Sequence, residues 1–366
     1  MGKKAVIIGA GFAAKMHVKA LKTLGIPVKC VISAHKESAK KFAEEYDIPE
    51  YGTAVEAALD ESVTHVHICT PPASHAELIK KLITAGKNVL CEKPLCVSEK
   101  EVSDILKLID ERKQTGQKTG RLALNYNVRF FAAAGKMREI VRKGSFGKVT
   151  LVHGNYMQEF HALPSIYDWR YRPDMAGPMR AVTEIGSHWF DLAQFVSDSA
   201  ITGVSATFKN GSEYRILNDG IMSSEDANME EDFGDKKIHV DSEDAAAVTM
   251  RFDNGAMGNV MLSEISHGRN NHLFIEVDML DGSVWWNEED PNHVYFGKKN
   301  KPVSVEINAF GGGFNDSVAE LFREFYEEKE KSEMLPSVKD GARIVRVCNA
   351  VYESARQHSS WVNVKR

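Results

Sequence analysis

The sequence lacks the excess of basic residues that nucleic-acid-binding proteins carry. Its 366 residues have a formal net charge of −5 at pH 7, and its basic runs stop at two or three residues. Because phosphate backbones are bound through clustered Lys and Arg side chains, we expect no nucleic acid as a partner.

Long hydrophobic runs are absent as well. The first apolar run, Ala5 to Ile8, is shorter than the core of a signal peptide, and nothing approaches the roughly 20 apolar residues of a membrane span. Met1-Gly2 is not followed by the Ser or Thr that myristoylation needs, because position 6 is Val. We therefore expect a cytoplasmic protein that does not contact a membrane.

Cysteine is scarce, and no two cysteines have the spacing of metal ligands. An odd number within apolar, strand-like runs is typical of buried free thiols in a reducing compartment. The five cysteines are Cys30, Cys69, Cys91, Cys96 and Cys348. We expect no metal site. Hydrophobic residues make up 43% and charged residues 27% of the chain, which is typical of a globular protein, and the length favours two domains.

The first third of the chain alternates short apolar runs with segments of helical periodicity. This order predicts parallel βαβ units and a doubly wound α/β sheet, a dinucleotide-binding (Rossmann) domain over residues 1–127. The expected strands are 6–8, 28–32, 64–69, 89–91 and 122–124, and the expected helices are 13–24, 38–46, 75–85 and one that begins at Ser98.

Residues 128–366 follow a different pattern, with longer strands joined by tight turns such as Asp253-Asn254-Gly255 and Asp281-Gly282. The pattern predicts an α+β domain that has a large, open, mostly antiparallel sheet. The expected strands are 148–154, 201–208, 245–252, 256–263 and 274–280, and the expected helices are 131–142, 187–196, 316–330 and 339–358. The acidic stretch Ser223 to Asp235 is expected to be a surface loop.

A glycine turn, Gly9-x-Gly11-x-x-Ala14, follows the first strand and opens the first helix. Glycines at this place let the backbone approach a pyrophosphate, which then lies at the amino end of the helix, beside Phe12 and Ala13. The alternative is a turn that is glycine-rich for structural reasons only.

The end of the second strand indicates the cofactor. An NAD enzyme usually presents Asp or Glu there for the ribose hydroxyls, whereas this chain has Ser33-Ala34-His35-Lys36. Ser33 can donate to a phosphate, and His35 or Lys36 can supply positive charge. We therefore favour NADP(H), with NAD(H) as the alternative, unless His35 and Lys36 only begin a surface helix.

The next two strand ends carry Thr70-Pro71-Pro72 and Glu92-Lys93-Pro94. Ligands of open α/β sheets bind beyond the carboxyl ends of the strands, so Thr70, Pro71 and Glu92 are expected to contact the cofactor. His75 either caps the following helix or touches the cofactor. Lys93 can polarise a carbonyl or accept a proton beside a nicotinamide, or it is an exposed lysine paired with Glu92.

A second constellation is Glu184-Ile185-Gly186-Ser187-His188-Trp189-Phe190-Asp191. If the segment is helical, Glu184, His188 and Asp191 project to one side. A carboxylate can orient an imidazole that takes the proton of a substrate hydroxyl. A structural histidine is the alternative; no further ligand of suitable spacing suggests a metal.

Together these motifs resemble the glucose–fructose oxidoreductase / inositol dehydrogenase (Gfo/Idh/MocA) family over nearly the whole chain. The motifs that carry the resemblance are Gly9-x-Gly11-x-x-Ala14, Thr70-Pro71-Pro72-x-x-His75, Glu92-Lys93-Pro94 and Glu184-x-Gly186-x-His188-x-x-Asp191. The resemblance implies that Lys93 and His188 are catalytic. Position 184 is commonly Asp in the family, so the contact of Glu184, to a substrate hydroxyl or to His188, is open.

The resemblance further implies an oxidation of a secondary alcohol on a sugar or cyclitol, or the reverse reduction. His188 would handle the hydroxyl proton and Lys93 would polarise the same oxygen, so both side chains are expected beside the nicotinamide. It also implies that residues 128–366 bind the substrate and form a homodimer or homotetramer through the open sheet. Two other functions remain: glycoside cleavage with a retained NAD that is transiently reduced, and a nucleotide-binding module without chemistry.

Several polar and aromatic side chains could hold a polyol by hydrogen bonds or by stacking, although each could equally be an ordinary surface cluster. They follow the predicted strands or precede the His188 segment. These candidate substrate ligands are Tyr126, Asn127, Tyr156, Asp168, Trp169, Arg170 and His267.

Overall fold

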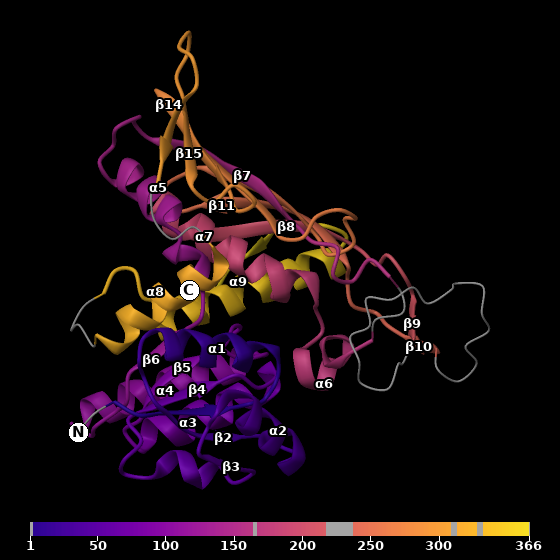
Figure 1. Ribbon diagram of the computed structural model, residues 1–366. Coiled ribbons are helices and arrows are strands. Elements are labelled where there is room, and N and C mark those ends of the chain that lie inside the picture. The colour runs from indigo at the N-terminus through magenta and orange to yellow at the C-terminus, as the bar shows by residue number, and fades with distance from the viewer. Residues whose placement is uncertain (1–2, 164–166, 217–236, 309–312, 328–331, 366) are drawn as a thin grey trace. The chain divides into compact units, whose positions relative to one another are not determined.

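The computed structural model describes residues 3–163, 167–216, 237–308, 313–327 and 332–365 (Figure 1). The expected loop from Ser223 to Asp235 lies outside them. The chain forms two compact units. Unit one contains Met1–Phe130 and Gly313–Val345, and unit two contains Phe131–Gly312 and Arg346–Arg366.

Unit one is built on a six-stranded sheet whose order is β3-β2-β1-β4-β5-β6. Every pair of neighbours is parallel, which confirms the predicted doubly wound sheet. The strands are β1 (Ala5–Ile8), β2 (Val28–Ile32), β3 (Glu50–Gly52), β4 (His65–Ile68), β5 (Asn88–Cys91) and β6 (Leu122–Leu124). The short, largely exposed β3 has no counterpart in the prediction.

The strand order reverses between β1 and β4, which makes their carboxyl ends the switch point of the sheet. All residues of β1 and β4 are buried, as expected for parallel strands covered on both faces. The helices of this unit are α1 (Phe12–Thr23), α2 (Lys36–Tyr46), α3 (His75–Thr84), α4 (Glu99–Gln114) and α8 (Phe314–Tyr326). A capping box of Ser98 and Glu101 begins α4, as predicted.

The prediction assigned every residue after 127 to the second domain, and the structure differs. Residues 313–345 belong to unit one, because the apolar face of α8 packs against α1. Leu321, Phe322 and Phe325 of α8 are fully buried in one cluster with Val18 and Leu21 of α1. Periodicity alone predicts that a helix has an apolar face, but not which distant element covers it.

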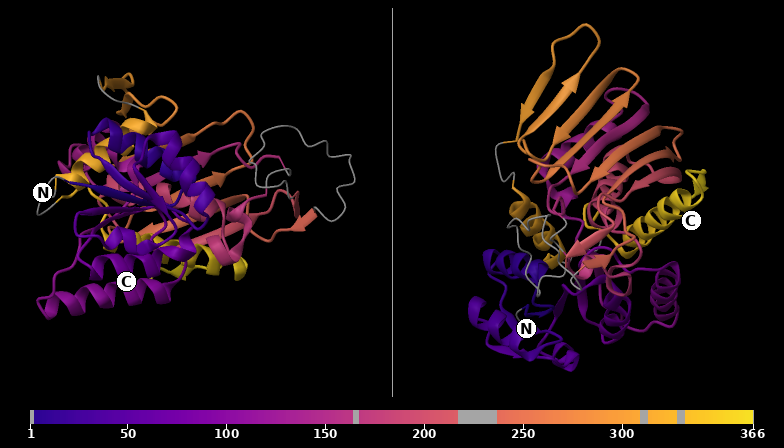
Figure 2. Two further views of the ribbon diagram at one scale, coloured as in Figure 1. Left: turned by 60° about the horizontal axis from the view of Figure 1, so that its bottom comes forward. Right: turned by 90° about the vertical axis from the view of Figure 1, so that its right-hand side faces the viewer.

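Unit two contains a nine-stranded sheet in the order β16-β15-β14-β13-β7-β12-β11-β8-β17 (Figure 2). The neighbours are antiparallel except for β7 and β12, so the predicted mostly antiparallel sheet is confirmed. The strands are β7 (Val149–Met157), β8 (Ile201–Lys209), β11 (Ala245–Phe252), β12 (Met257–Ser263), β13 (His272–Met279), β14 (Gly282–Asn287), β15 (His293–Gly297), β16 (Ser304–Ile307) and β17 (Val362–Asn363). A separate ribbon pairs β9 (Tyr214–Ile216) with β10 (Lys237–His239).

One face of the nine-stranded sheet is packed and the other is open. Buried and accessible residues alternate along β11, β12 and β13, which is the pattern of a strand that buries one face. Two helices, α5 (Ala132–Arg142) and α7 (Ser187–Ser197), contact the sheet. A short α6 (Pro173–Ala176) precedes α7, and α9 (Val338–Arg356) contains the boundary between the units.

Two expectations about the whole chain can be compared with the structure. All five cysteines are buried and none forms a disulfide, which confirms the prediction of buried thiols. Among the described residues, no helix combines the length and the apolar character that crossing a bilayer requires.

Candidate active site

The glycine turn has the geometry that a pyrophosphate requires. Gly9 has a φ of +113°, and a Cβ there would lie 2.5 Å from the carbonyl oxygen of Cys69, so that only glycine fits between β1 and β4. Gly11 is the N-cap of α1, and nothing lies within 4 Å of the place of its Cβ. No side chain caps α1 and its first turn holds no acid, which leaves amide donors and the positive end of the helix dipole for an anion. Phe12 is 66% exposed beside this cradle.

The end of β2 presents no carboxylate before α2. The Ser33 amide donates to the carbonyl of Gly52, and its side chain is half-buried. His35 is the N-cap of α2, and both His35 and Lys36 are exposed. Glu37, in the first turn of α2, is the nearest acid in the sequence. Serine, histidine and lysine thus stand where an NAD-specific enzyme usually has Asp or Glu.

His75 is the first residue of α3 and not its N-cap, which is Ser74. The imidazole is buried, with Nδ1 2.8 Å from the carbonyl oxygen of Pro94 and Nε2 2.8 Å from that of Thr70. Burial lowers the pKa of His75 despite these two acceptors. The side chain therefore braces the two loops that follow β4 and β5, and its predicted contact with a cofactor stays a prediction.

Glu92, just beyond β5, is buried and accepts three hydrogen bonds. Oε1 lies 2.9 Å from His17 Nε2 and 2.7 Å from Asn125 Nδ2, and Oε2 accepts from the main-chain N–H of Lys93 at 3.2 Å. Burial alone would raise the pKa of Glu92, but its hydrogen bonds with His17 and Asn125 and the charge of Lys93 lower it to about 2. Lys93 is half-buried. The prediction missed His17, because a histidine on the buried face of α1 carries no motif.

Two predicted substrate ligands, Tyr126 and Asn127, lie in the interior of unit one. Tyr126 is fully buried, and Asn127 is 1% exposed. The Asn127 amide donates to Ser317 Oγ at 2.8 Å, a contact that joins the end of the Rossmann sheet to α8. For both residues, the predicted contact with a substrate stays a prediction.

Glu184 and His188 lie where a π-helix (Val182–Gly186) passes into α7. The predicted one-sided alignment assumed α-helical spacing, whereas a π-helix holds more residues in a turn and is frequent at functional sites. His188 is 8% exposed and Asp191 is buried. A Cβ on Gly186 would lie 2.6 Å from Leu262 Cδ1, so glycine allows this segment to approach β12 closely.

Four predicted site residues meet in one cluster in unit two. Arg170 Nε lies 3.3 Å from Glu184 Oε2, and Arg170 Nη1 lies 2.8 Å from Asp168 Oδ2. Asp168 Oδ1 also caps the short helix that starts at Trp169, and the Arg170 guanidinium lies over the Trp169 ring at 4.5 Å. Two carboxylates, a guanidinium and an indole together are suited to hold and stack a polyol.

Tyr156 extends this cluster through residues that the prediction missed. Its hydroxyl donates to Asn271 Oδ1 at 2.8 Å, as does the amide of Gln158 at 2.6 Å, and Asn271 Nδ2 donates to Glu288 Oε1 at 2.7 Å. Burial raises the pKa of Glu288 to about 8. Burial, Glu288 and Glu184 together raise the pKa of Tyr156. His267, by contrast, is exposed.

A buried ion-pair network holds the start of the π-helix. Arg180 pairs with Asp244 and Glu264 without exposure to solvent, and the main-chain amides of Arg180 and Val182 donate to the Glu243 carboxyl group. Burial raises the pKa of Glu243 to about 7. This network fixes the backbone that carries Glu184.

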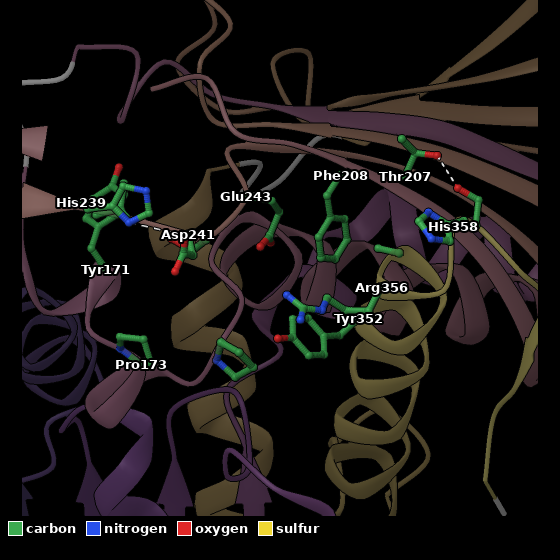
Figure 3. A pocket seen from close by; sticks show the side chains of 15 residues that line it. Tyr171, Pro173, Thr207, Phe208, His239, Asp241, Glu243, Tyr352, Arg356 and His358 are labelled. Atoms are coloured by element: carbon green, nitrogen blue, oxygen red, sulfur yellow. Dashed lines mark hydrogen bonds and ion pairs between the residues drawn. The ribbon is translucent and has the colours of Figure 1, made fainter. Parts of the chain in front are cut away.

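A hollow of about 730 Å³ lies in unit two, and Glu243 is one of the residues that line it. Figure 3 shows Phe208, Tyr352 and Arg356 beside Glu243 on its border. None of the predicted site residues lines it. Among the described residues, one group has the spacing of a metal site, His153, Glu276 and Asp278 on β7 and β13, and none of these is a predicted ligand.

Comparison with known proteins gives two family matches. Residues 3–118 match the Gfo/Idh/MocA oxidoreductase family with an NAD-binding Rossmann fold, and residues 135–285 match the Gfo/Idh/MocA C-terminal domain. Levoglucosan dehydrogenase of Pseudarthrobacter phenanthrenivorans is 27% identical over 98% of this chain and 97% of that protein. Inositol 2-dehydrogenase of Rhizobium meliloti is 30% identical over 55% and 57% of the two chains.

A solved structure of levoglucosan dehydrogenase in complex with NADH and levoglucosan has the same fold. It covers 100% of both chains with a TM-score of 0.86 and 23% sequence identity.

Proposed function

The chain belongs to the Gfo/Idh/MocA oxidoreductase family, and we propose that it transfers a hydride between nicotinamide C4 and a secondary alcohol or ketone carbon of a sugar or cyclitol. The observation that carries this proposal is the glycine cradle before α1. It belongs to the same parallel sheet as β5, the strand that ends just before Lys93. A cradle for pyrophosphate at the switch point directs the rest of a dinucleotide along the strand ends where Lys93 stands.

The family resemblance supports the roles that we propose for three side chains. A bound nicotinamide supplies the hydride acceptor or donor. In the direction of oxidation, the carbinol C–H electron pair leaves as hydride while His188 takes the hydroxyl proton. Lys93 polarises the same oxygen, and Glu184, tied to Arg170 at 3.3 Å, orients either His188 or a substrate hydroxyl.

We further propose that the substrate is a polyol held by the cluster of Asp168, Trp169 and Arg170, with Tyr156 beside it. Carboxylates and guanidinium groups bind vicinal hydroxyls, and the Trp169 ring offers an apolar face for the carbon skeleton. Tyr126, Asn127 and His267 complete the candidate ligands. The named substrates of the relatives, levoglucosan and inositol, belong to this class.

Preference for NADP(H) is the finer part of the proposal. It is supported by Ser33, His35 and Lys36, which bring no negative charge to the end of β2. A carboxylate there would repel a 2′-phosphate, and its absence removes that repulsion. NAD(H) is the alternative, and a levoglucosan dehydrogenase was solved with NADH. Measured kcat/KM values for the two cofactors decide between them.

The decisive experiment is a panel of anhydrosugars, sugars and inositols with each cofactor, followed at the nicotinamide absorbance. Stoichiometric cofactor reduction supports the proposal, whereas turnover without net absorbance change indicates a retained cofactor and glycoside cleavage. Cofactor binding without turnover of any substrate indicates a binding module. With an active substrate, His188→Ala should lower kcat by at least about 100-fold, and a change in KM alone would give His188 a binding role.

A homodimer or homotetramer through the open sheet is part of the same proposal. The face turned away from α5 and α7 carries exposed apolar side chains, which is typical of interaction surfaces. They include Leu151, Met257 and Met261 on β7 and β12, which are 38%, 54% and 45% exposed.

A further inference from the structure

Four buried polar side chains of unit one form a continuous chain of hydrogen bonds that no catalytic role yet uses. Glu92 Oε1 lies 2.9 Å from His17 Nε2, and His17 Nδ1 lies 2.8 Å from His67 Nδ1. His67 Nε2 lies 2.8 Å from the hydroxyl of Tyr326 on α8. His17 and His67 have no exposed surface, and Tyr326 is 4% exposed.

The ionised carboxylate at one end determines where the protons lie. Glu92 can only accept, so His17 Nε2 must carry a proton. A neutral His17 then accepts at Nδ1, which makes His67 Nδ1 the donor. His67 Nε2 in turn accepts from the Tyr326 hydroxyl. In this arrangement each hydrogen bond of the chain pairs one donor atom with one acceptor atom.

The surroundings of His67 favour its neutral form over an added proton. Burial, with the nearby His17 and His65, holds the pKa of His67 well below its usual value. The ring of Phe322 packs edge-on against His17 at 4.8 Å. The other titratable groups that face the chain are His65, whose pKa burial lowers to about 4, the thiols of Cys69 and Cys91, and Lys3, which bonds the Tyr326 carbonyl. None of these groups carries a negative charge that would stabilise a cation at His67.

The chain of hydrogen bonds ends at the backbone of Lys93, just beyond β5. Glu92 Oε2 accepts the Lys93 N–H at 3.2 Å, while the Pro94 carbonyl lies 2.8 Å from His75 Nδ1. The main chain on both sides of the Lys93 side chain is therefore held by buried histidines, directly by His75 and through Glu92 by His17. A shift of the Glu92 carboxylate would move the point from which the lysine extends.

We propose that His17 and His67 are positioning residues for Lys93, acting through the Glu92 carboxylate that they fix in one rotamer and one charge state. The proposal rests on the proposed catalytic role of Lys93. Neither histidine reaches the reacting atoms. Instead, their paired tautomers, His17 protonated at Nε2 and His67 at Nδ1, decide that Glu92 receives a proton donor and not a lone pair.

The tautomers can be measured without any substrate. In protein labelled with ¹⁵N-histidine, long-range ¹H–¹⁵N spectra distinguish the protonated ring nitrogen of each of the 13 histidines, and His17→Gln and His67→Gln assign two of them. We expect the Nε2–H form for His17 and the Nδ1–H form for His67 at neutral pH. The Nδ1–H form of His17, or two protonated rings, would overturn the proposal.

A matched pair of variants tests positioning by its effect on rate. Gln at position 17 places an amide donor near the site of Nε2, whereas Asn reaches only the site of Nδ1. We expect His17→Asn to lower kcat by about 10- to 100-fold, because a small misplacement of a catalytic group has that effect, with KM within about twofold. His17→Gln should recover most of the loss. His65→Gln, which changes a histidine stacked on Tyr326 outside the chain, should leave kcat unchanged.

The outcomes separate this inference from the proposed function. A purely structural role would make both His17 variants less stable and leave kcat of the folded fraction at the wild-type value, which would refute positioning. Equal losses in His17→Asn and His17→Gln would refute the role of the Nε2 donor. If no polyol is turned over by the wild-type protein, the proposed function fails, and the tautomer measurement still decides whether the hydrogen-bond chain exists as described.

Discussion

Gly9 and Gly11 stand two residues apart in the turn after β1, and their surroundings predict different losses on substitution. Gly9→Ala introduces a Cβ 2.5 Å from the Cys69 carbonyl oxygen at a φ of +113°. We expect it to lower the free energy of unfolding by at least about 2 kcal/mol. Gly11→Ala meets open space, so it should leave stability nearly unchanged and weaken cofactor binding, because the methyl group fills the approach of the pyrophosphate.

Urea unfolding and a cofactor fluorescence titration of both variants check this contrast. Equal destabilisation by the two substitutions would contradict the close approach of β1 and β4. Normal cofactor affinity of Gly11→Ala would contradict the cradle.

The raised pKa of Glu288 predicts that this one side chain makes the stability of the protein depend on pH. Burial raises its pKa from 4.5 to about 8, and Asn271 offsets only part of that shift. The folded state therefore holds this proton more tightly than the unfolded state does. The corresponding stability is fully present below pH 4.5 and is lost as the pH rises toward about 8. Glu288→Gln keeps an acceptor for Asn271 and cannot ionise, so its unfolding free energy should depend less on pH over this range.

The measurement is urea unfolding of wild type and Glu288→Gln at a series of pH values. A pH profile identical in both proteins would show that Glu288 is ionised at neutral pH in the folded state. Glu276→Gln is a comparison variant: burial and Asp278 also raise the pKa of Glu276, but this residue lies on a more accessible part of the sheet, so its substitution should change the pH dependence less.

At the scale of elements, α8 is the piece of unit one that comes from the far end of the sequence. Phe322 is fully buried between α1 and His67. Phe322→Ala should cost about 3–5 kcal/mol of unfolding free energy, through lost apolar burial and the cavity left behind. Glu320→Ala, on the exposed side of the same helix, removes only a surface ion pair with Arg323 and should cost under about 1 kcal/mol.

Limited proteolysis and thermal unfolding separate the two α8 variants. A Phe322→Ala protein as stable as wild type would mean that α8 does not belong to the core of unit one.

The elements that the sequence predicted well are those whose burial is complete. β1 and β4 are buried on every residue. β1 reads as an apolar run, β4 alternates histidine with Val66 and Ile68, and the glycine turn between strand and helix has a local signature. The docking of α8 was missed because it depends on partners more than 180 residues away. The widened turn at Glu184 was missed because a single turn of π-helix is too short to show a hydrophobic period of its own in the sequence.

The candidate site shows the same division. Motif residues such as Lys93 and His188 could be named from local order. Asp168, Arg170 and Glu184 could be named as polar side chains in or before the His188 segment, and the structure brings them into one cluster. Gln158, Asn271 and Glu288 could not be named, because each follows or precedes a different strand and only the sheet register brings them together. His17 and His67 looked like ordinary core residues of a helix and a strand.

At the scale of the whole molecule, the proposed chemistry needs both units. Lys93 belongs to unit one and His188 to unit two, and the proposed reaction uses both side chains. Each unit prepares its own group: unit one holds the backbone at Lys93 through Glu92 and His75, and unit two holds the π-helix through Arg180 and Glu243. Because the preparations are separate, a defect in either should lower kcat without unfolding the other unit.

The open face of the nine-stranded sheet gives a prediction about assembly. Met257 is 54% exposed on β12 near the centre of the sheet, and a stable dimer needs roughly 800 Å² buried on each partner. Met257→Lys would place a charge in that interface, so we expect a shift from the wild-type oligomer toward monomer in light scattering coupled to size exclusion. Tyr51→Lys, on the exposed edge strand β3, is the matched control and should keep the wild-type mass. A wild-type protein that is monomeric at micromolar concentration, or a Met257→Lys protein of unchanged mass, would mean that this face is not the interface.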